Sequence, residues 1–237
     1  MTTPTQHNEP HAINVSRKSN WLRAAVLGAN DGIVSTAGLV VGVAGATDSK
    51  IIILTAGLAG IIAGALSMAA GEYVSVSTQR DIEKSLLDKE RKELKESPEY
   101  ELAELAGLYE AKGLSKKTSL IVAKELTEKD AFAAHVDAEL GIDPKNLTNP
   151  WSAAYASAAS FLVGALIPVG VIMLPLGMLT VPITFGSVVL ALIITGLLSA
   201  KTGGSNVKKS IIRVVIGGVA AMVVTYAIGR IFNVSGI

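Results

Sequence analysis

Residues 51–96 constrain the fold of this chain more than any other stretch, because their sequence indicates one helix that lies partly in a lipid bilayer and partly in water. Residues 51–70 carry no charge over about twenty positions, a length that crosses the hydrocarbon core of a bilayer at about 1.5 Å rise per residue. From Glu72 onward the stretch is charged, yet neither Pro nor Gly interrupts it before Ser97-Pro98. We therefore predict one continuous helix that starts in a membrane and continues into water.

The composition indicates a membrane protein. Half of the 237 residues are hydrophobic, and the mean hydropathy of +0.47 is too high for an ordinary soluble domain. The absence of Cys excludes disulfides and thiolate metal sites, so carboxylate, thioether, imidazole and backbone oxygen remain as metal ligands.

Five apolar segments predict an all-α fold, a five-span transmembrane helical bundle with a helical insert between spans two and three. The predicted spans are residues 24–47, 51–70, 151–174, 181–200 and 211–232. The corresponding domains are a polar N-terminal tail (1–20), spans one and two (21–79), the insert (80–147) and spans three to five (148–237). The insert holds 16 of the 20 acidic residues, which indicates a soluble domain. Lys and Arg in the short flanks of the spans place the N-terminus and the insert in the cytoplasm and the C-terminus outside.

Span one contains an acidic residue, Asp31, within its apolar sequence. An ionisable group inside a span is costly, so a functional role is the default interpretation. Small residues surround it at spacings of three and four: Gly28, Ser35, Gly38, Gly42 and Gly45. A second such stripe follows span two: Gly57, Gly60, Gly64, Ser67 and Gly71. We expect Asp31 to face the protein interior and the two stripes to let spans one and two approach closely.

Met68 and Glu72 lie four residues apart, on one helical face, where hydrocarbon gives way to water. A thioether beside a carboxylate indicates a metal site. The alternatives are that Met68 only fills a gap in the packing and that Glu72 only extends to the water interface.

Acidic pairs in the insert also indicate a metal site. Glu90 with Glu93, and Glu101 with Glu104, are three residues apart, and His135 precedes Glu139 by one turn. Carboxylates on two or three packed helices supply the oxygen ligands that a divalent transition metal accepts. The alternative is a set of solvated helix faces, with Glu93 paired to Lys89.

Polar and glycine residues predict where the helices of the insert begin and end. Ser97, Ser115 and Thr127 are the predicted N-caps, and Gly113 and Gly141 are the predicted terminators.

The segments GANDGIVS (28–35), SMAAGEYVS (67–75) and ELGI (139–142) resemble the vacuolar iron transporter family, and the similarity extends over nearly the whole chain. The resemblance implies a five-span protein that exports ferrous iron and manganese from the cytosol in exchange for protons, as a dimer with the ion path at the subunit interface. It implies a transport path through Asp31, Met68 and Glu72.

The same resemblance implies a cytoplasmic metal-binding domain. Its implied ligands are Glu90, Glu93, Glu101, Glu104 and Glu139. His135 stands where a family methionine ligand is expected, which leaves the role of that position open. The absence of long terminal extensions resembles prokaryotic members, so we expect a bacterial plasma membrane.

We therefore expect a proton antiporter for Fe²⁺ or Mn²⁺, without a prosthetic group, that acts as a homodimer and binds no nucleic acid. Two alternatives stay open: a passive cation channel, and a membrane-anchored metal sensor or storage protein. An enzyme is not expected, because the soluble part has no Ser-His-Asp set, Cys nucleophile or phosphate-binding Gly loop.

Overall fold

A computed structural model describes residues 15–235, and the side chains of residues 21–233. Most of the predicted polar tail, residues 1–14, lies outside the described residues. The described part is helical and contains no strand, and five of its helices are long and apolar enough to cross a membrane, which confirms the predicted fold class. The candidate spans are Trp21–Ala46, Lys50–Glu96, Pro150–Ile172, Gly177–Gly203 and Val207–Asn233.

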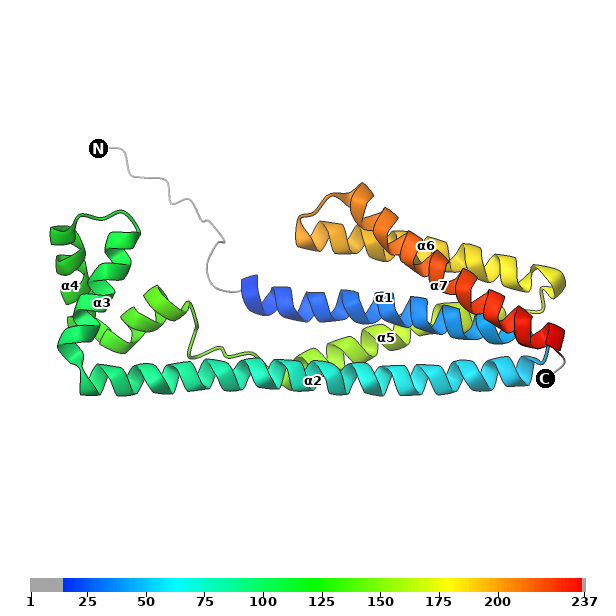
Figure 1. Cartoon of the computed structure of the whole chain (residues 1–237), viewed down its shortest axis with the longest axis horizontal. Coiled ribbons are helices and arrows are strands. Elements are labelled where there is room, and N and C mark those ends of the chain that lie inside the picture. The colour runs from blue at the N-terminus through cyan, green and yellow to red at the C-terminus, as the bar shows by residue number, and fades with distance from the viewer. Residues whose placement is uncertain (1–14, 236–237) are drawn as a thin grey trace, which may run out of the picture. The chain divides into compact units, whose positions relative to one another are not determined.

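The helices follow one another in the order predicted (Figure 1). They are α1 (Val15–Ala46), α2 (Lys50–Glu96), α3 (Pro98–Ala111), α4 (Lys116–His135), the π-helical turn η1 (Val136–Leu140), α5 (Pro150–Ile172), the short 3₁₀ turn η2 (Gly177–Leu179), α6 (Thr180–Gly203) and α7 (Val207–Ser235). The prediction of one unbroken helix from the second apolar segment to Ser97-Pro98 is confirmed by α2.

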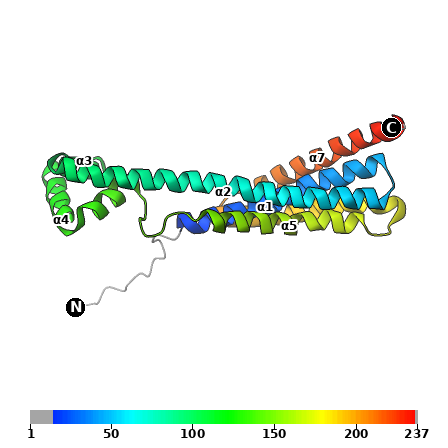
Figure 2. The ribbon, with the colours of Figure 1, turned by 90° about the horizontal axis from the view of Figure 1, so that it is seen from below.

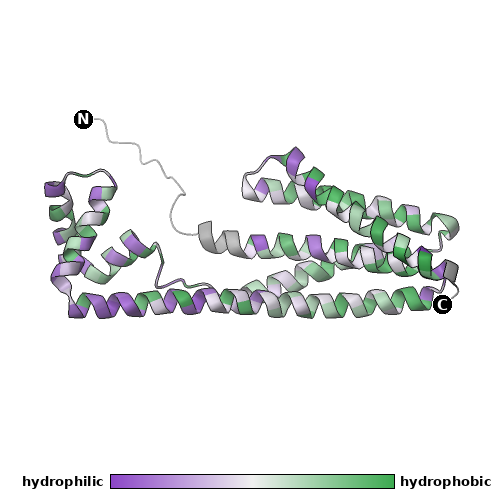
Figure 3. Cartoon of the chain, in the orientation of Figure 1, coloured by the Kyte–Doolittle hydropathy of each residue, from purple (hydrophilic) through white to green (hydrophobic). Residues whose placement is uncertain are grey.

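The chain forms two compact units. Unit 1 combines the residues up to Val74 with those from Pro150 onward, and unit 2 consists of Ser75–Asn149. Hydrophobic residues dominate the helices of unit 1, whereas polar residues dominate those of unit 2 (Figure 3). Such a division is typical of a membrane bundle and a water-soluble domain.

Within unit 1, α1 packs against α5, α6 and α7, and the view in Figure 2 shows α5 running beside it. The core of the unit is made of small and branched side chains of α1, such as Ala37 and Val40, together with Phe161 and Leu192, all of them buried. Two side chains tie the helix ends together. The Lys50 ammonium donates to the carbonyls of Met173 and Leu174, directly after α5, and the Asn233 amide donates to the carbonyl of Ala46.

The glycines of the α1 stripe do not pack against α2, so the expectation is wrong for this stripe. A Cβ at Gly28 would overlap the backbone carbonyl of Ser157 in α5, and one at Gly42 would lie 3.2 Å from the carbonyl oxygen of Thr225 in α7. The reason is that the stripe meets two neighbours in succession, α5 with its first part and α7 with its later part.

The stripe of α2 contacts side chains instead of backbone. Gly57 faces Val169 and Val40, while Gly71 faces open space. Small residues at regular spacing therefore mark a close approach in α1 but do not identify the partner helix.

Capping groups define the helices of unit 2 largely as predicted. Ser97 is the N-cap of α3, without a capping hydrogen bond from its side chain, and the Ser115 hydroxyl accepts a hydrogen bond from the amide of Thr118. Gly113 and Gly141 have φ angles of 100° and 60°. Both glycines thus end helices in the left-handed region, as expected.

The predicted helix start at Thr127 is wrong. Helix α4 continues past this residue and is distorted only at Asp130, whose carboxylate accepts a hydrogen bond from the amide of Ala133. An aspartate caps at least as well as a threonine, so Asp130 takes the role that the sequence assigned to Thr127.

Candidate metal sites

A cavity of about 200 Å³ lies between α1 and α2 of unit 1, and it brings together two of the predicted path residues. Asp31 of α1 and Met68 of α2 both line it. The carboxylate and the thioether therefore face one space, although 37 positions separate them in the chain. The interior-facing position expected for Asp31 agrees with this placement.

Small and hydroxylated residues shape the rest of this cavity. Gly60 and Gly64 leave the wall of α2 without side chains, and the hydroxyl of Thr36 is buried without a hydrogen-bond partner among the described residues. A buried hydroxyl without a partner is costly unless something else bonds to it. Ser35 of α1 and Ser67 of α2 add further hydroxyl-bearing residues to the lining.

Phe161 closes the cavity from α5, and it is 2% exposed. Sequence reasoning missed this residue, because one aromatic side chain in an apolar helix is indistinguishable from ordinary core packing. Its ring lies against Gly64, where a Cβ would overlap it. The ring thus contacts the helix that carries Met68.

Glu72, the third predicted path residue, does not line the cavity. It lies one turn beyond Met68 and faces Arg23 of α1, with 3.9 Å between Oε1 and the guanidinium nitrogen. Glu72 is 11% exposed and Arg23 is 60% exposed. At this separation the pair contributes only weakly to stability. The sequence analysis used Arg23 only to orient the spans.

A second candidate site lies in unit 2, around the side chain of His135. Its Nδ1 is 3.0 Å from a carboxylate oxygen of Glu90, 3.7 Å from Glu101 and 3.9 Å from Glu139. The four residues come from α2, α3, α4 and η1, so only the tertiary packing assembles them. The cation–π contact of Arg91 on the Phe132 ring, at 4.5 Å, holds α2 against α4 nearby.

The electrostatics of this cluster are unfavourable without a cation. Burial raises the pKa of Glu90 to about 7, and the charges of Glu139 and Glu101 add to the effect. Burial also raises the pKa of Glu101, as does the charge of Glu104, while the His135 imidazole lowers it. Buried carboxylates of this kind need a proton or a cation to neutralise them.

Hydrogen bonding is incomplete as well. Glu90 Oε1 and both ring nitrogens of His135 are buried and form no hydrogen bond among the described residues, because the 3.0 Å contact between Nδ1 and Oε1 is not aligned as one. One ligand atom each from Glu90, His135 and Glu139 lies within 4.8 Å of the others. Ligands bound at about 2.1 Å to one octahedral ion lie about 3 to 4.2 Å apart. Small side-chain adjustments would therefore bring these atoms onto a shared ion.

The other two predicted ligands of the insert lie outside this group. Glu93 forms an ion pair of 3.0 Å with Lys89, which is the alternative that the sequence left open for it. Glu104 is exposed, although its charge still acts on Glu90 and Glu101. Both carboxylates lie near the buried cluster without contacting His135.

Comparison with known proteins gives one consistent family. The VIT family profile matches residues 22–230. A protein of Acanthamoeba castellanii named vacuolar iron transporter is 42% identical over 227 residues, which cover 95% of this chain and 84% of that protein. Vacuolar iron transporter homolog 2.1 of Arabidopsis thaliana is 35% identical, over 94% of this chain and 86% of that protein. Homolog 5 of Oryza sativa subsp. japonica is 36% identical, over 95% of this chain and 86% of that protein. These are names of transporters and not of enzymes, as the sequence led us to expect.

Proposed function

The chain belongs to the VIT family, and we propose that it is a multi-pass membrane transporter that moves Fe²⁺ or Mn²⁺ out of the cytosol in exchange for protons. The observation that carries the proposal is the single cavity of unit 1 that both Asp31 and Met68 line. A carboxylate without a partner inside an apolar helical bundle destabilises the bundle, so Asp31 has no use as a purely structural residue.

The ligand chemistry supports a transition metal as the substrate. Ca²⁺ and Mg²⁺ prefer shells made entirely of oxygen, whereas a thioether favours softer ions. A cavity with one carboxylate, one thioether and several hydroxyls therefore suits Fe²⁺ better than Ca²⁺. The carboxylate keeps the site acceptable to Mn²⁺.

The cluster around His135 would collect the ion before transport. Glu90, Glu101 and Glu139 supply carboxylate oxygens, and His135 supplies an imidazole nitrogen. A bound dication would neutralise the buried carboxylates and occupy the ring nitrogen that lacks a partner. We propose Glu93 and Glu104, at the edge of the cluster, as the residues that attract the ion first.

Proton exchange follows from the requirement that ligands be ionised. A carboxylate must release its proton to accept the metal, and it binds a proton again when the metal leaves. If Asp31 and Glu72 alternate between metal and proton, each ion that moves outward draws protons inward.

We also propose that the transporter is a homodimer, with the N-terminus and unit 2 in the cytosol. Ser35 and Leu39 line the cavity and are themselves exposed, so a single copy leaves one side of the path uncovered. Apolar side chains of α2, among them Ile62 and Leu66, are also exposed and available for a second copy.

Transport by purified protein in liposomes tests the proposal. A pH-sensitive dye is enclosed, and Fe²⁺ or Mn²⁺ is added outside. The wild type should move metal and protons in opposite directions, and Asp31→Ala should abolish both movements. Asp48→Ala is the matched control, because Asp48 is an exposed acidic residue in the link between α1 and α2. Normal transport by Asp31→Ala would refute the path, and metal flux without protons would replace the antiporter by a channel.

A further inference from the structure

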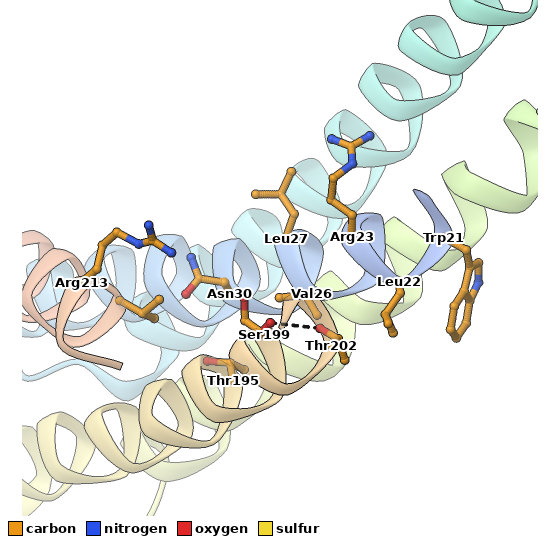
Figure 4. Close-up of a pocket in the computed structure, with 12 residues that line it drawn as sticks. Trp21, Leu22, Arg23, Val26, Leu27, Asn30, Thr195, Ser199, Thr202 and Arg213 are labelled. Carbon is orange, nitrogen blue, oxygen red and sulfur yellow. Dashed lines mark hydrogen bonds between the residues drawn. The ribbon is translucent and has the colours of Figure 1, made fainter. Parts of the chain in front are cut away.

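A second and larger cavity of unit 1, about 880 Å³, lies between α1, α6 and α7 and shares no lining residue with the cavity of Asp31 (Figure 4). One set of its lining residues is apolar, and another is polar or cationic. The apolar set is Trp21, Leu22, Val26, Leu27 and Val214, and the polar set includes Arg23, Asn30 and Arg213. A cavity of this size holds a ligand far larger than a simple ion.

The charge of the cavity has one sign. Arg23 and Arg213 line it, and no Asp or Glu does. Arg23 faces Glu72 at 3.9 Å, whereas Arg213 has no carboxylate partner among the described side chains. Figure 4 shows the two guanidinium groups on either side of Asn30 and Leu27. Arg213, which has no carboxylate partner, is therefore the side chain suited to an anionic oxygen group such as a phosphodiester.

The remaining polar groups narrow the choice of ligand. Asn30 Oδ1 is buried without a hydrogen-bond partner among the described residues, while the hydroxyls of Thr195 and Thr202 already donate to carbonyls of their own helix. Asn30 Oδ1 is therefore free to accept a hydrogen bond from a hydroxyl of the ligand.

The position of the cavity also favours a lipid. Arg23 and Trp21 stand at the start of the first candidate span, and Gly203 ends α6. Trp and Arg at the ends of spans lie at the level of the lipid headgroups. Apolar side chains of the same lining would contact the first carbons of an acyl chain.

We propose that this cavity binds the headgroup of an anionic phospholipid, with Arg213 on the phosphate and Asn30 Oδ1 accepting a hydrogen bond from a headgroup hydroxyl. Basic pockets between membrane helices are suited to such headgroups. The lipid would join α1, which carries Asp31, to α6 and α7.

The test uses delipidated full-length protein in detergent, titrated with phosphatidylglycerol or with phosphatidylcholine of the same acyl chains. Binding is followed by native mass spectrometry and by the unfolding midpoint. Phosphatidylglycerol should bind and stabilise, and phosphatidylcholine should not. Arg213→Gln should weaken phosphatidylglycerol binding about fivefold, the equivalent of about 1 kcal/mol for one arginine. Arg230→Gln is the matched control, an exposed arginine at the other end of α7, and should bind like the wild type.

A second variant fills the cavity without changing its charge. Ser199→Phe should also weaken phosphatidylglycerol binding at least fivefold. Equal binding of the two lipids, or unchanged binding by both variants, overturns the proposal. So does displacement of the lipid by inorganic phosphate alone, because the ligand is then a soluble anion. If Ser199→Phe alters the oligomeric state instead, a second copy occupies the cavity and the proposal is also wrong.

Discussion

Replacing Gly164 with Ala should separate α5 from α1 and disable the site that these helices build. A Cβ at this position would overlap the carbonyl oxygen of Ala29 and lie 3.2 Å from both the carbonyl carbon of Ala29 and Cγ1 of Ile33. Ordinary contacts of a Cβ begin at 3.4 Å. The backbones must therefore move apart by several tenths of an ångström, directly beside Asp31.

The size of the effect follows from two opposing terms. Overpacking of a close contact costs about 1 to 3 kcal/mol. Exchanging a helical glycine for alanine gains about 1 kcal/mol in helix propensity. Gly170 isolates the second term, since it belongs to the same helix and its Cβ would meet nothing within 4 Å. The propensity gain is the same in both variants, so Gly164→Ala should be less stable than Gly170→Ala by the overpacking cost alone, about 1 to 3 kcal/mol.

Thermal unfolding of the two purified variants in one detergent measures this difference. Because about 1 kcal/mol shifts the midpoint by roughly 2 to 4 °C in a chain of this length, Gly164→Ala should unfold at least roughly 2 °C below Gly170→Ala. Metal transport in liposomes should fall only for Gly164→Ala. Equal midpoints for the two variants would refute the close packing of α1 on α5, and with it the account of how Asp31 is positioned.

Further predictions concern the cluster around His135. The metal affinity of the cluster, measured by calorimetry, should rise about tenfold from pH 6 to pH 8. With a pKa of about 7, the Glu90 carboxyl is about one tenth ionised at pH 6 and about nine tenths ionised at pH 8. A metal affinity that does not change with pH would contradict this prediction. Because the pKa of Glu90 is raised, the metal-free protein should lose stability as the pH rises from 4.5 through 7. Removal of the metal by a chelator should therefore lower the unfolding midpoint of unit 2 more at pH 8 than at pH 5. His135→Gln should weaken metal binding by roughly tenfold or more in the same calorimetry, while Glu128→Gln, an exposed control on α4, leaves it unchanged; equal affinities would remove His135 from the ligands.

The sequence by itself determined the fold class. Twenty uncharged residues have one low-energy arrangement in a bilayer, because every backbone amide and carbonyl must bond within its own segment. The five spans and the unbroken course of α2 follow from that requirement. Local rules also explain the helix ends at Ser115 and Gly141, since capping bonds and left-handed glycines involve only neighbouring residues.

Candidate ligands were recognisable from residue type and spacing, but their grouping was not. Spacing of three or four residues shows that Glu90 and Glu93 share a face, yet the structure turns Glu93 toward Lys89 and gathers Glu90 with His135. The difference arises because α3, α4 and η1 bury one part of that face and leave the other in water. Burial of a particular carboxylate depends on these neighbours and not on its own sequence.

Packing partners within the membrane were likewise decided only by the tertiary structure. Gly28 and Gly42 belong to one stripe but contact α5 and α7, and Phe161 reaches the cavity of Asp31 from a helix without any polar signal. In lipid, apolar side chains give no preference for one neighbour over another, so helices associate through the detailed fit of their surfaces. That fit depends on several helices at once, and it is why the spans could be predicted from the sequence while the cavities between them could not.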